Sequence, residues 1–158
     1  MYYDANNLYG WSMIQNLSTG DYKWEDVNIW NVDKIMSINE NSTTGYIFDV
    51  DLEYPKELHD LHNHYPLCPE RKLIKSDWLS TYQKELKTKL NVSDDHVEKL
   101  VTDLYDKNGY VTHYRNLQLY LQLGLKLKKI NKVLSFTQEP LLKDYITSNS
   151  LLRQLVRG

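Results

Sequence analysis

Apolar and polar residues alternate most clearly between Tyr46 and Leu52. A period of two is the period of side chains along a β-strand, so this segment predicts a strand with one buried face. The two faces would carry Phe48, Val50 and Leu52 on one side, and Ile47, Asp49 and Asp51 on the other. Pro55 follows, and it is expected to end the strand and to open a short helix through Leu61.

Helical spacing of apolar residues and capping signals predict further helices over residues 8–14, 32–38, 77–90 and 117–123. Ser76 would cap the third of these, an amphipathic helix. Gly124 would end the fourth. Pro140 is expected to open a last helix. Its inward-facing side chains would be Leu142, Tyr145 and Ile146.

Extended segments are predicted over residues 21–24, after a turn at Thr19-Gly20, and over residues 125–136. Asn108-Gly109 lies between two strand-like runs, and this dipeptide is a strong short-range signal of a β-hairpin. Together these elements predict an α+β domain with one mixed or antiparallel sheet and helices on one of its faces. The length of 158 residues suits a single domain with its own core.

The formal net charge is −2, so the chain as a whole does not attract nucleic acid. The charge is uneven, because residues 21–60 are acidic and the final third is basic. The single Cys68 excludes an internal disulfide. No apolar run approaches the ~20 residues of a membrane span, and the N-terminus lacks the features of a signal peptide. We therefore expect an intracellular protein without a membrane partner.

The stretch from Tyr2 to Gly10 carries the most informative chemistry, with the sequence Tyr-Tyr-Asp-Ala-Asn-Asn-Leu-Tyr-Gly. The leading tyrosines favour an extended strand, and the two asparagines favour a turn. Asp4 therefore lies where a strand ends and the chain bends. Backbone N–H groups in such a bend can hold phosphate oxygens, and a carboxylate there can hold Mg²⁺ together with substrate phosphates. In isolation, an aspartate at such a position is more often a turn or cap residue.

The pattern Asp-x-x-Asn-Leu-Tyr-Gly resembles motif A of the family B DNA polymerases. It is most similar to the protein-primed branch, which is found in viruses, linear plasmids and Polinton/Maverick-type transposons. Weaker similarity extends over nearly the whole chain, to about Asn149. The resemblance implies a polymerase palm, with a palm segment carrying motif A at residues 1–62 and a palm and insertion region at residues 63–158. The expected fold is therefore an α+β partial palm with a small insertion subdomain.

The resemblance also implies a role for each residue of the motif. Asp4 would be the catalytic carboxylate that binds both Mg²⁺ (or Mn²⁺) ions, and the Ala5 carbonyl would contact the metal on the nucleotide side. The backbone of Asn6, Asn7 and Leu8 would lie along the triphosphate of a dNTP. Tyr9 would pack under the deoxyribose and exclude a 2′-hydroxyl by a steric clash. The implied reaction is in-line attack of a primer hydroxyl on the α-phosphate, assisted by two metal ions.

The implied partners are a DNA template–primer, a dNTP and a terminal (primer) protein. The expected contacts to DNA phosphates are Arg115, Lys126, Lys128 and Lys129, each of which could equally be a surface charge. The second carboxylate motif of the family, Asp-Thr-Asp, and its phosphate-binding lysine helix do not occur in the sequence. We therefore expect a truncated palm that does not extend a primer by itself. The expected location is the nucleus or a viral or mobile-element replication site.

Three alternatives remain open at this point. Asp49 and Asp51 would point to one side of their strand and could pair with Asp4 as metal ligands, although no turn residue accompanies them. A Zn²⁺ site could use four side chains within ten residues, namely His59, His62, His64 and Cys68. Surface histidines at a helix end are the simpler interpretation. Finally, the chain could be a non-catalytic remnant of a mobile element that binds nucleic acid or protein through its basic C-terminal half.

Overall fold

The computed structural model describes residues 7–91 and 98–157, with side chains as far as Leu155. The strands are β1 (Leu17–Trp24), β2 (Thr44–Glu53), β3 (Glu70–Leu73), β4 (Glu98–Val101), β5 (Lys107–His113) and β6 (Lys126–Glu139). The α-helices are α1 (Leu8–Met13), α2 (Val32–Met36), α3 (His59–His62), α4 (Thr81–Lys89), α5 (Tyr114–Gln122) and α6 (Lys143–Arg157). Short 3₁₀ helices are η1 (Val27–Ile29), η2 (Lys56–Leu58) and η3 (Ser76–Trp78).

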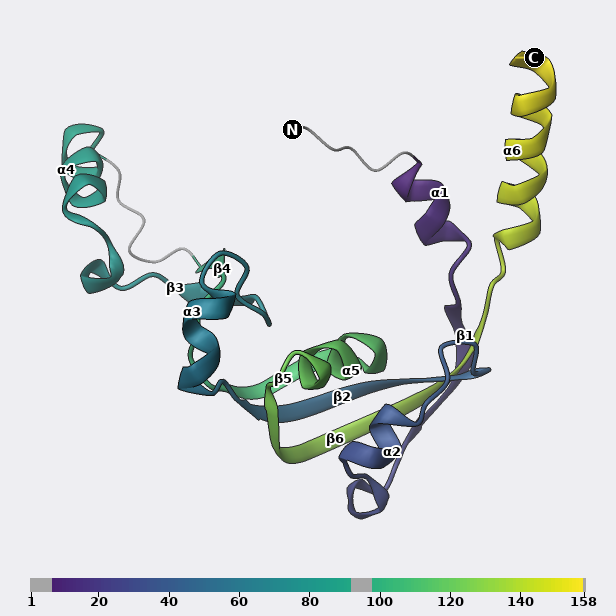
Figure 1. Cartoon of the computed structure of the whole chain (residues 1–158), viewed down its shortest axis with the longest axis horizontal. Helices are drawn as coiled ribbons and strands as arrows, with labels where there is room; N and C mark the ends of the chain where they lie inside the picture. Colours follow the sequence, from purple (N-terminus) through teal and green to yellow (C-terminus); the bar gives the residue numbers. More distant parts are fainter. Residues whose placement is uncertain (1–6, 92–97, 158) are drawn as a thin grey trace.

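Four strands form the central sheet, in the order β1–β6–β2–β5, and each neighbouring pair is antiparallel. β2 pairs with β6 along its whole length, from Thr44 opposite Thr137 to Glu53 opposite Lys126. β5 pairs with the other edge of β2, and β1 with the other edge of β6. Two arms rise from this sheet in Figure 1, one formed by β3, β4 and α4 and the other by α1 and α6.

The hydrophobic core lies on one face of β2. Phe48, Val50 and Leu52 are completely buried there, as the alternating pattern predicts. Tyr114 and Leu117 of α5 pack in the same core. Burying side chains of this size contributes about 1.5–3 kcal/mol each to folding, so this face of β2 is the main source of stability in the domain.

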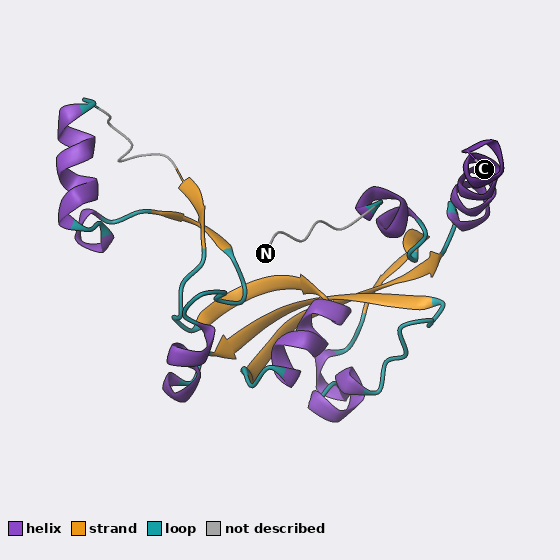
Figure 2. Cartoon of the chain, turned by 45° about the horizontal axis from the view of Figure 1, so that its top comes forward, coloured by secondary structure: helices purple, strands orange, loops and turns teal. Residues whose placement is uncertain are grey.

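Helices α2 and α5 cover the same side of the sheet, as Figure 2 shows. The Gln118 side chain of α5 donates hydrogen bonds to the carbonyls of Ile35 (2.8 Å) and Ile38 (2.9 Å), which joins α5 to the end of α2. On the opposite face of the sheet, Asp49 and Asp51 are half-buried and Trp24 is 71% exposed. The prediction of an α+β fold with an antiparallel sheet is therefore confirmed.

The predicted hairpin at Asn108-Gly109 is wrong. Both residues lie inside β5, which pairs with β2, and the run before them contributes β4, which pairs with β3. Gly109 has a φ of 63°, and its N–H donates to Asp51 Oδ1 at 2.8 Å, where the pairing of β2 and β5 shifts in register. The left-handed residue therefore forms a β-bulge, which is the other common use of glycine in a strand.

The helix predicted over residues 77–90 begins later, at Thr81. Ser80 caps it: its Oγ accepts from the Gln83 N–H (3.2 Å), and its own N–H donates to Gln83 Oε1 (2.9 Å). This capping box satisfies two backbone N–H groups, those of Ser80 and Gln83, so the α-helix starts after Ser80. Ser76 starts η3 instead. The expected burial of the apolar side is also absent, because α4 contains no buried residue.

The turn predicted at Thr19-Gly20 is a distortion within β1. Gly20 has a φ of 149° and Asp21 a φ of 54°, and the pairing with β6 shifts in register on both sides of Gly20. The signal for an unusual backbone conformation was therefore correct, but the strand continues through it. The helix over residues 8–14 and the strand over residues 125–136 are confirmed by α1 and β6.

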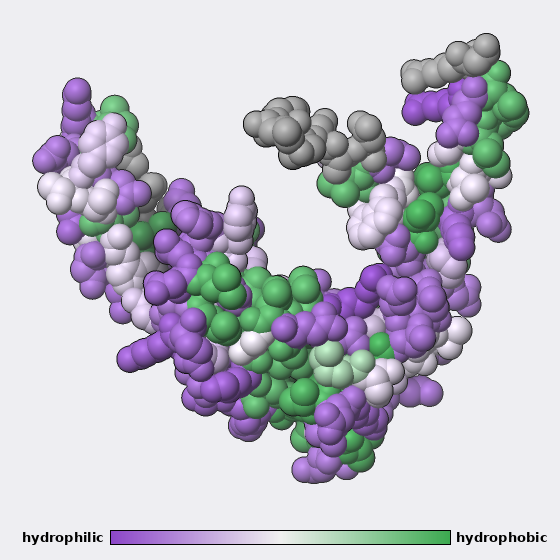
Figure 3. Space-filling model, in the orientation of Figure 1, coloured by the Kyte–Doolittle hydropathy of each residue, from purple (hydrophilic) through white to green (hydrophobic). Residues whose placement is uncertain are grey.

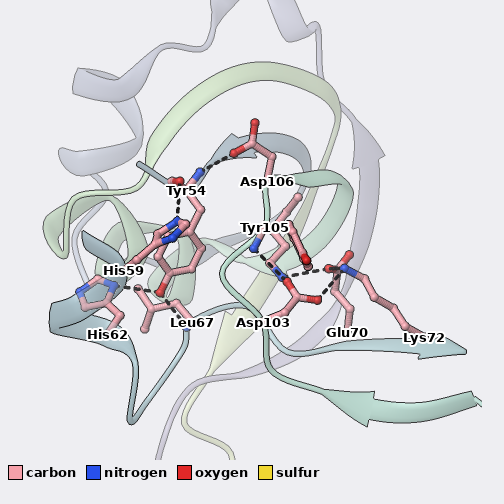
Figure 4. A network of polar contacts seen from close by, with 10 residues as sticks. Tyr54, His59, His62, Leu67, Glu70, Lys72, Asp103, Tyr105 and Asp106 are labelled. Atoms are coloured by element: carbon pink, nitrogen blue, oxygen red, sulfur yellow. Dashed lines mark hydrogen bonds and ion pairs between the residues drawn. The ribbon is translucent and has the colours of Figure 1, made fainter. Parts of the chain in front are cut away.

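A buried ionic cluster joins the β3–β4 sheet to the central sheet (Figure 4). The Lys107 side chain is fully buried at the start of β5, and its Nζ lies 2.5 Å from Asp103 Oδ1 and 3.1 Å from Glu70 Oε2. Lys72 of β3 contacts the same two carboxylates, at 2.9 Å and 2.6 Å. Two ammonium groups thus neutralise two carboxylates at the junction.

The cluster predicts a pH dependence of stability. Burial alone would raise the pKa of Asp103, but hydrogen bonds from Lys107 and Lys72 bring that pKa below its ordinary value of 3.8. A carboxyl with a lowered pKa stabilises the folded state above its unfolded pKa, and this contribution is lost as the pH falls through the folded pKa. Chemical denaturation should therefore show stability declining below about pH 4.

Asp103→Asn should be less stable than the unaltered chain at neutral pH and should lose less stability on acidification. The exposed Asp60→Asn control should follow the unaltered chain; equal acid sensitivity of all three would contradict the role of Asp103.

Candidate functional site

α1 begins at a sharp bend in the chain. Asn7 adopts the left-handed conformation, with φ 57° and ψ 39°, and its carbonyl accepts the first helical hydrogen bond, from the Trp11 N–H (3.0 Å). Asparagine tolerates this conformation better than most residues, because its short amide can bond to nearby backbone. The turn that the two asparagines predict is therefore present at Asn7.

Gly10 makes room for the Asn7 side chain. A Cβ atom at residue 10 would lie 2.5 Å from Asn7 Nδ2 and 2.6 Å from Asn7 Oδ1, closer than non-bonded atoms approach. The Asn7 amide therefore lies directly over the helix backbone at the buried Gly10. Sequence reasoning assigned no role to Gly10, although residues three apart on a helix share a face.

Tyr9 lies on the surface of α1, and its side chain is 85% exposed. It lines a groove between α1 and α6 with a volume of about 630 Å³ (the α1–α6 groove). The two helices lie side by side in both Figure 1 and Figure 2. One side of the groove is lined by Asn7, which caps α1, and by Tyr9, Gly10 and Met13 of α1. The other side is lined chiefly by residues of α6, namely Tyr145, Asn149, Leu152 and Arg153. A volume of this size suits a small-molecule ligand.

The side of α6 that was expected to face inward is exposed instead. Leu142, just before the helix, is 39% exposed and Tyr145 is 67% exposed, while Ile146 is half-buried. Figure 3 shows hydrophobic residues along α6, toward the end of its arm. The helix stands away from the core and its neighbour is α1, so its apolar side chains have no sheet to cover.

Three of the predicted site residues, Asp4, Ala5 and Asn6, lie outside the described residues. Within the described part of the chain, the α1–α6 groove is lined by amides, hydroxyls, apolar groups and one guanidinium, with no carboxylate among them. None of the described lining residues therefore offers a negatively charged ligand to a cation.

Asp49 and Asp51 lie on the same face of β2, as the alternation predicts, and both are already hydrogen-bonded. Asn131 Nδ2 donates to Asp49 Oδ1 (3.2 Å) and to Asp51 Oδ1 (2.9 Å). The Gly109 N–H and then the Asn131 amide lower the pKa of Asp51, so it is held as the carboxylate. These contacts fasten the bulges of β5 and β6 to β2, which is a structural role.

The four predicted DNA contacts lie near different ends of β2. Arg115 contacts Glu40 Oε2 (3.3 Å) and Gln15 Oε1 (3.4 Å), which joins the start of α5 to the loop before β2 and to the chain after α1. Lys126 lies at the far end, 3.6 Å from Glu53 Oε1. Lys128 lies 3.4 Å from Asp106 Oδ2. Lys129 lies opposite Asp51 and has no salt bridge among the described residues.

These pairings balance much of the charge that the sequence suggested was free to bind DNA. Surface ion pairs of this length are worth about 0–1 kcal/mol and are easily exchanged. Arg115, Lys126 and Lys128 therefore remain available to a phosphate backbone only at the cost of their present partners. The structure offers no single basic surface that contains all four.

The histidines and the cysteine of the zinc alternative have other partners. His62 Nδ1 shares a hydrogen bond with the Tyr54 hydroxyl (2.8 Å), and His59 Nε2 one with the Tyr54 carbonyl (3.3 Å), both visible in Figure 4. Cys68 is fully buried, and burial raises its pKa to about 12, whereas a zinc ligand must be a thiolate. His64 is exposed. No group of three or more metal-ligating side chains occurs in residues 7–91 and 98–157, so the zinc interpretation has no support.

Comparisons with protein-family models, with curated proteins and with solved structures found no match. None of the helices in the described part of the chain is long and apolar enough to cross a membrane.

Sequence reasoning missed the contribution of α6 to the groove. Tyr145, Asn149 and Arg153 recur at intervals of four residues, which places them on one face of a helix. That spacing could have been read from the sequence. The proximity of this face to α1, at the other end of the chain, could not.

Proposed function

We propose that this chain binds a deoxynucleoside triphosphate and a divalent cation around Asp4–Tyr9, as the palm segment of a family B DNA polymerase of the protein-primed type. The observation that carries the proposal is the nine-residue stretch from Tyr2 to Gly10, which contains each residue that the polymerase motif needs. The left-handed bend at Asn7 and the exposed ring of Tyr9 beside a groove of suitable volume support it.

The described residues would act on the nucleotide mainly by positioning it. The exposed face of the Tyr9 ring provides an apolar surface for a deoxyribose, and a 2′-hydroxyl on that surface would clash rather than bind. Asn7 presents an amide at the mouth of the same groove. Holding the sugar and the phosphates together in this way fixes the α-phosphate for in-line attack, which is the entropic part of catalysis.

Asp4 would hold Mg²⁺ or Mn²⁺ next to the triphosphate, since these cations prefer one or two carboxylates together with substrate phosphates and water. When bound, the cation would stabilise the oxygens that enter and leave at the α-phosphate. The sequence contains no Asp-Thr-Asp, so the proposal for these 158 residues is binding of nucleotide and metal. Strand extension is proposed only for a protein that also supplies a second carboxylate.

Calorimetric titration of dTTP into the purified chain tests the proposal. We expect binding in Mg²⁺, little or none in EDTA, and weaker binding of 5-methyluridine triphosphate, which differs from dTTP only by its 2′-hydroxyl. Equal titrations in Mg²⁺ and EDTA, or no heat in either, would contradict the proposal. Salt-dependent binding of an oligonucleotide without any metal requirement would instead favour the non-catalytic nucleic-acid-binding alternative.

Gly10→Ala provides an independent test of the site. The added Cβ must displace the Asn7 amide, so dTTP affinity should fall by about tenfold, the equivalent of one lost hydrogen bond to a charged group. Thermal stability should stay unchanged or rise slightly, because alanine favours a helix by about 0.8–1 kcal/mol over glycine. Ser12→Ala, on the same helix, is the matched control and should bind normally. A Gly10→Ala variant with unaltered affinity would remove Asn7 from the site.

A further inference from the structure

A second pocket lies between α2, the loop that follows it and the start of β2, with a volume of about 730 Å³ (the Trp30 pocket). In Figure 1, α2 lies below the central sheet, whereas the α1–α6 arm rises above it. The apolar part of the lining consists of Trp30, Ile38 and Tyr46. The polar part combines the Lys34 ammonium with hydroxyls and amides, and the described lining residues include no carboxylate. The pocket therefore suits a small molecule that carries a negative charge.

The indole N–H of Trp30 has no hydrogen-bond partner. Trp30 is only 8% exposed, and its Nε1 atom is buried without an acceptor. The other buried side-chain atom without a hydrogen bond in the described part of the chain, Glu70 Oε2, faces the ammonium groups of Lys72 and Lys107 instead. Buried donors are normally paired, so the indole N–H requires an acceptor from water or from a ligand.

A cation lies next to this unpaired donor. Lys34 Nζ is 4.3 Å from the centroid of the Trp30 ring, so the ammonium and the indole N–H lie within a few ångströms of one another. Lys34 is exposed, and its side chain can turn toward a ligand without leaving a buried charge behind. The Tyr46 hydroxyl adds another donor, because burial and then the Glu25 carboxylate raise the pKa of Tyr46 and keep the hydroxyl protonated.

We propose that the Trp30 pocket binds a small organic carboxylate. One carboxylate oxygen accepts from the Trp30 indole N–H and the other faces the Lys34 ammonium, and charge-assisted contacts of this kind are stronger than neutral ones. The apolar body of the ligand rests on Ile38 and the Tyr46 ring. Gln118 Nε2 already holds the Ile38 carbonyl at 2.9 Å, so this wall is in place before the ligand arrives. The inference does not rest on the proposed function, because the two sites share no described residue.

The test follows the indole N–H signals of the four tryptophans by NMR while the full chain is titrated with benzoate. The Trp30 signal is identified by its loss in Trp30→Phe and by its change in Lys34→Gln. Lys75→Gln is the matched control for Lys34→Gln, because Lys75 lies 5.9 Å from the centroid of the Trp78 ring, outside the pocket. Both lysines are exposed, so neither substitution should disturb folding. Benzyl alcohol, which lacks the charge, and inorganic phosphate, which lacks the apolar body, are the comparison ligands.

We expect benzoate to shift the Trp30 signal until it saturates, with a Kd on the order of millimolar for a ligand of this size. The Trp78 signal should not move. Lys34→Gln should weaken benzoate binding by about tenfold, the usual effect of losing a charge-assisted hydrogen bond, whereas Lys75→Gln should leave it unchanged. Benzyl alcohol and phosphate should each bind about tenfold more weakly than benzoate.

A Trp30 signal that does not respond to benzoate far above millimolar concentration would overturn the proposal and leave water as the acceptor of the indole N–H. Equal losses in the two lysine variants would indicate a general charge effect and would also overturn it. If benzyl alcohol bound as tightly as benzoate, the pocket would not recognise the charge. If phosphate bound as tightly, the pocket would not recognise the organic part of the ligand. Either result would overturn the assignment of an organic carboxylate.

Discussion

Replacement of Lys107 by alanine should lower the free energy of unfolding by about 3 kcal/mol, the lower end of what breaking a buried ion pair costs. The ammonium of Lys107 has no exposure to solvent and contacts both Asp103 and Glu70. Its removal leaves two partly buried carboxylates with only Lys72 to neutralise them. It also leaves a cavity where the Cγ, Cδ and Cε methylene groups of the side chain were packed, which adds to the loss.

Lys72→Ala is the matched control for Lys107→Ala. It removes the same chemical group from the same two carboxylates, but its side chain is 28% exposed, so water can replace the ammonium. We expect a loss of about 0–1 kcal/mol, as for surface ion pairs. Urea denaturation of both variants, followed by tryptophan fluorescence, measures the difference. Equal losses would show that burial of Lys107 is not what makes it important.

The second large effect is expected for Asp4→Asn, which should weaken metal-dependent dTTP binding by on the order of 100-fold. An amide keeps the shape of the carboxylate but removes the charge that holds the cation. The binding that remains should be the same in Mg²⁺ and in EDTA, because phosphate contacts and the Tyr9 surface do not require metal.

Asp60→Asn is the control for Asp4→Asn. Asp60 is an exposed carboxylate on α3, on the side of the central sheet away from the α1–α6 arm (Figure 1). The Asp60→Asn variant should bind dTTP with the same affinity and the same dependence on Mg²⁺ as the unaltered chain. If Asp4→Asn retained full affinity and full dependence on Mg²⁺, the cation would have to be held elsewhere, and the assignment of Asp4 would be wrong.

Local signals predicted those elements whose two faces differ. The alternation across Phe48, Asp49, Val50 and Asp51 identified β2 and its buried side, because a strand with one face in the core requires that pattern. The hairpin prediction at Asn108-Gly109 was wrong because the outcome depends on a distant strand and not on the local sequence. The dipeptide reports only that Gly109 takes a left-handed conformation, and the pairing of β5 with β2 decides whether that becomes a turn or a bulge.

The candidate site was predictable only on its α1 side. The order of Asp4, Asn7 and Tyr9 indicates the proposed binding of a cation and a nucleotide, because a carboxylate, a turn and an aromatic ring follow one another within a few residues. Arg153 could not be included, since no local feature of α6 indicates that it lies beside α1. The exposure of Leu142 and Tyr145 was missed for the same reason: periodicity shows that a helix has an apolar side but not whether a core lies next to it.

The central claim is that a cation and a nucleotide bind together beside Tyr9, and paramagnetic relaxation by Mn²⁺ tests it most directly. In the presence of dTTP, low concentrations of Mn²⁺ should broaden the NMR signals of the Tyr9 ring and leave those of Tyr65, an equally exposed tyrosine just after α3, sharp. In Asp4→Asn the broadening at Tyr9 should disappear. Equal broadening of both rings, or broadening at Tyr9 that persists in Asp4→Asn, would contradict the account.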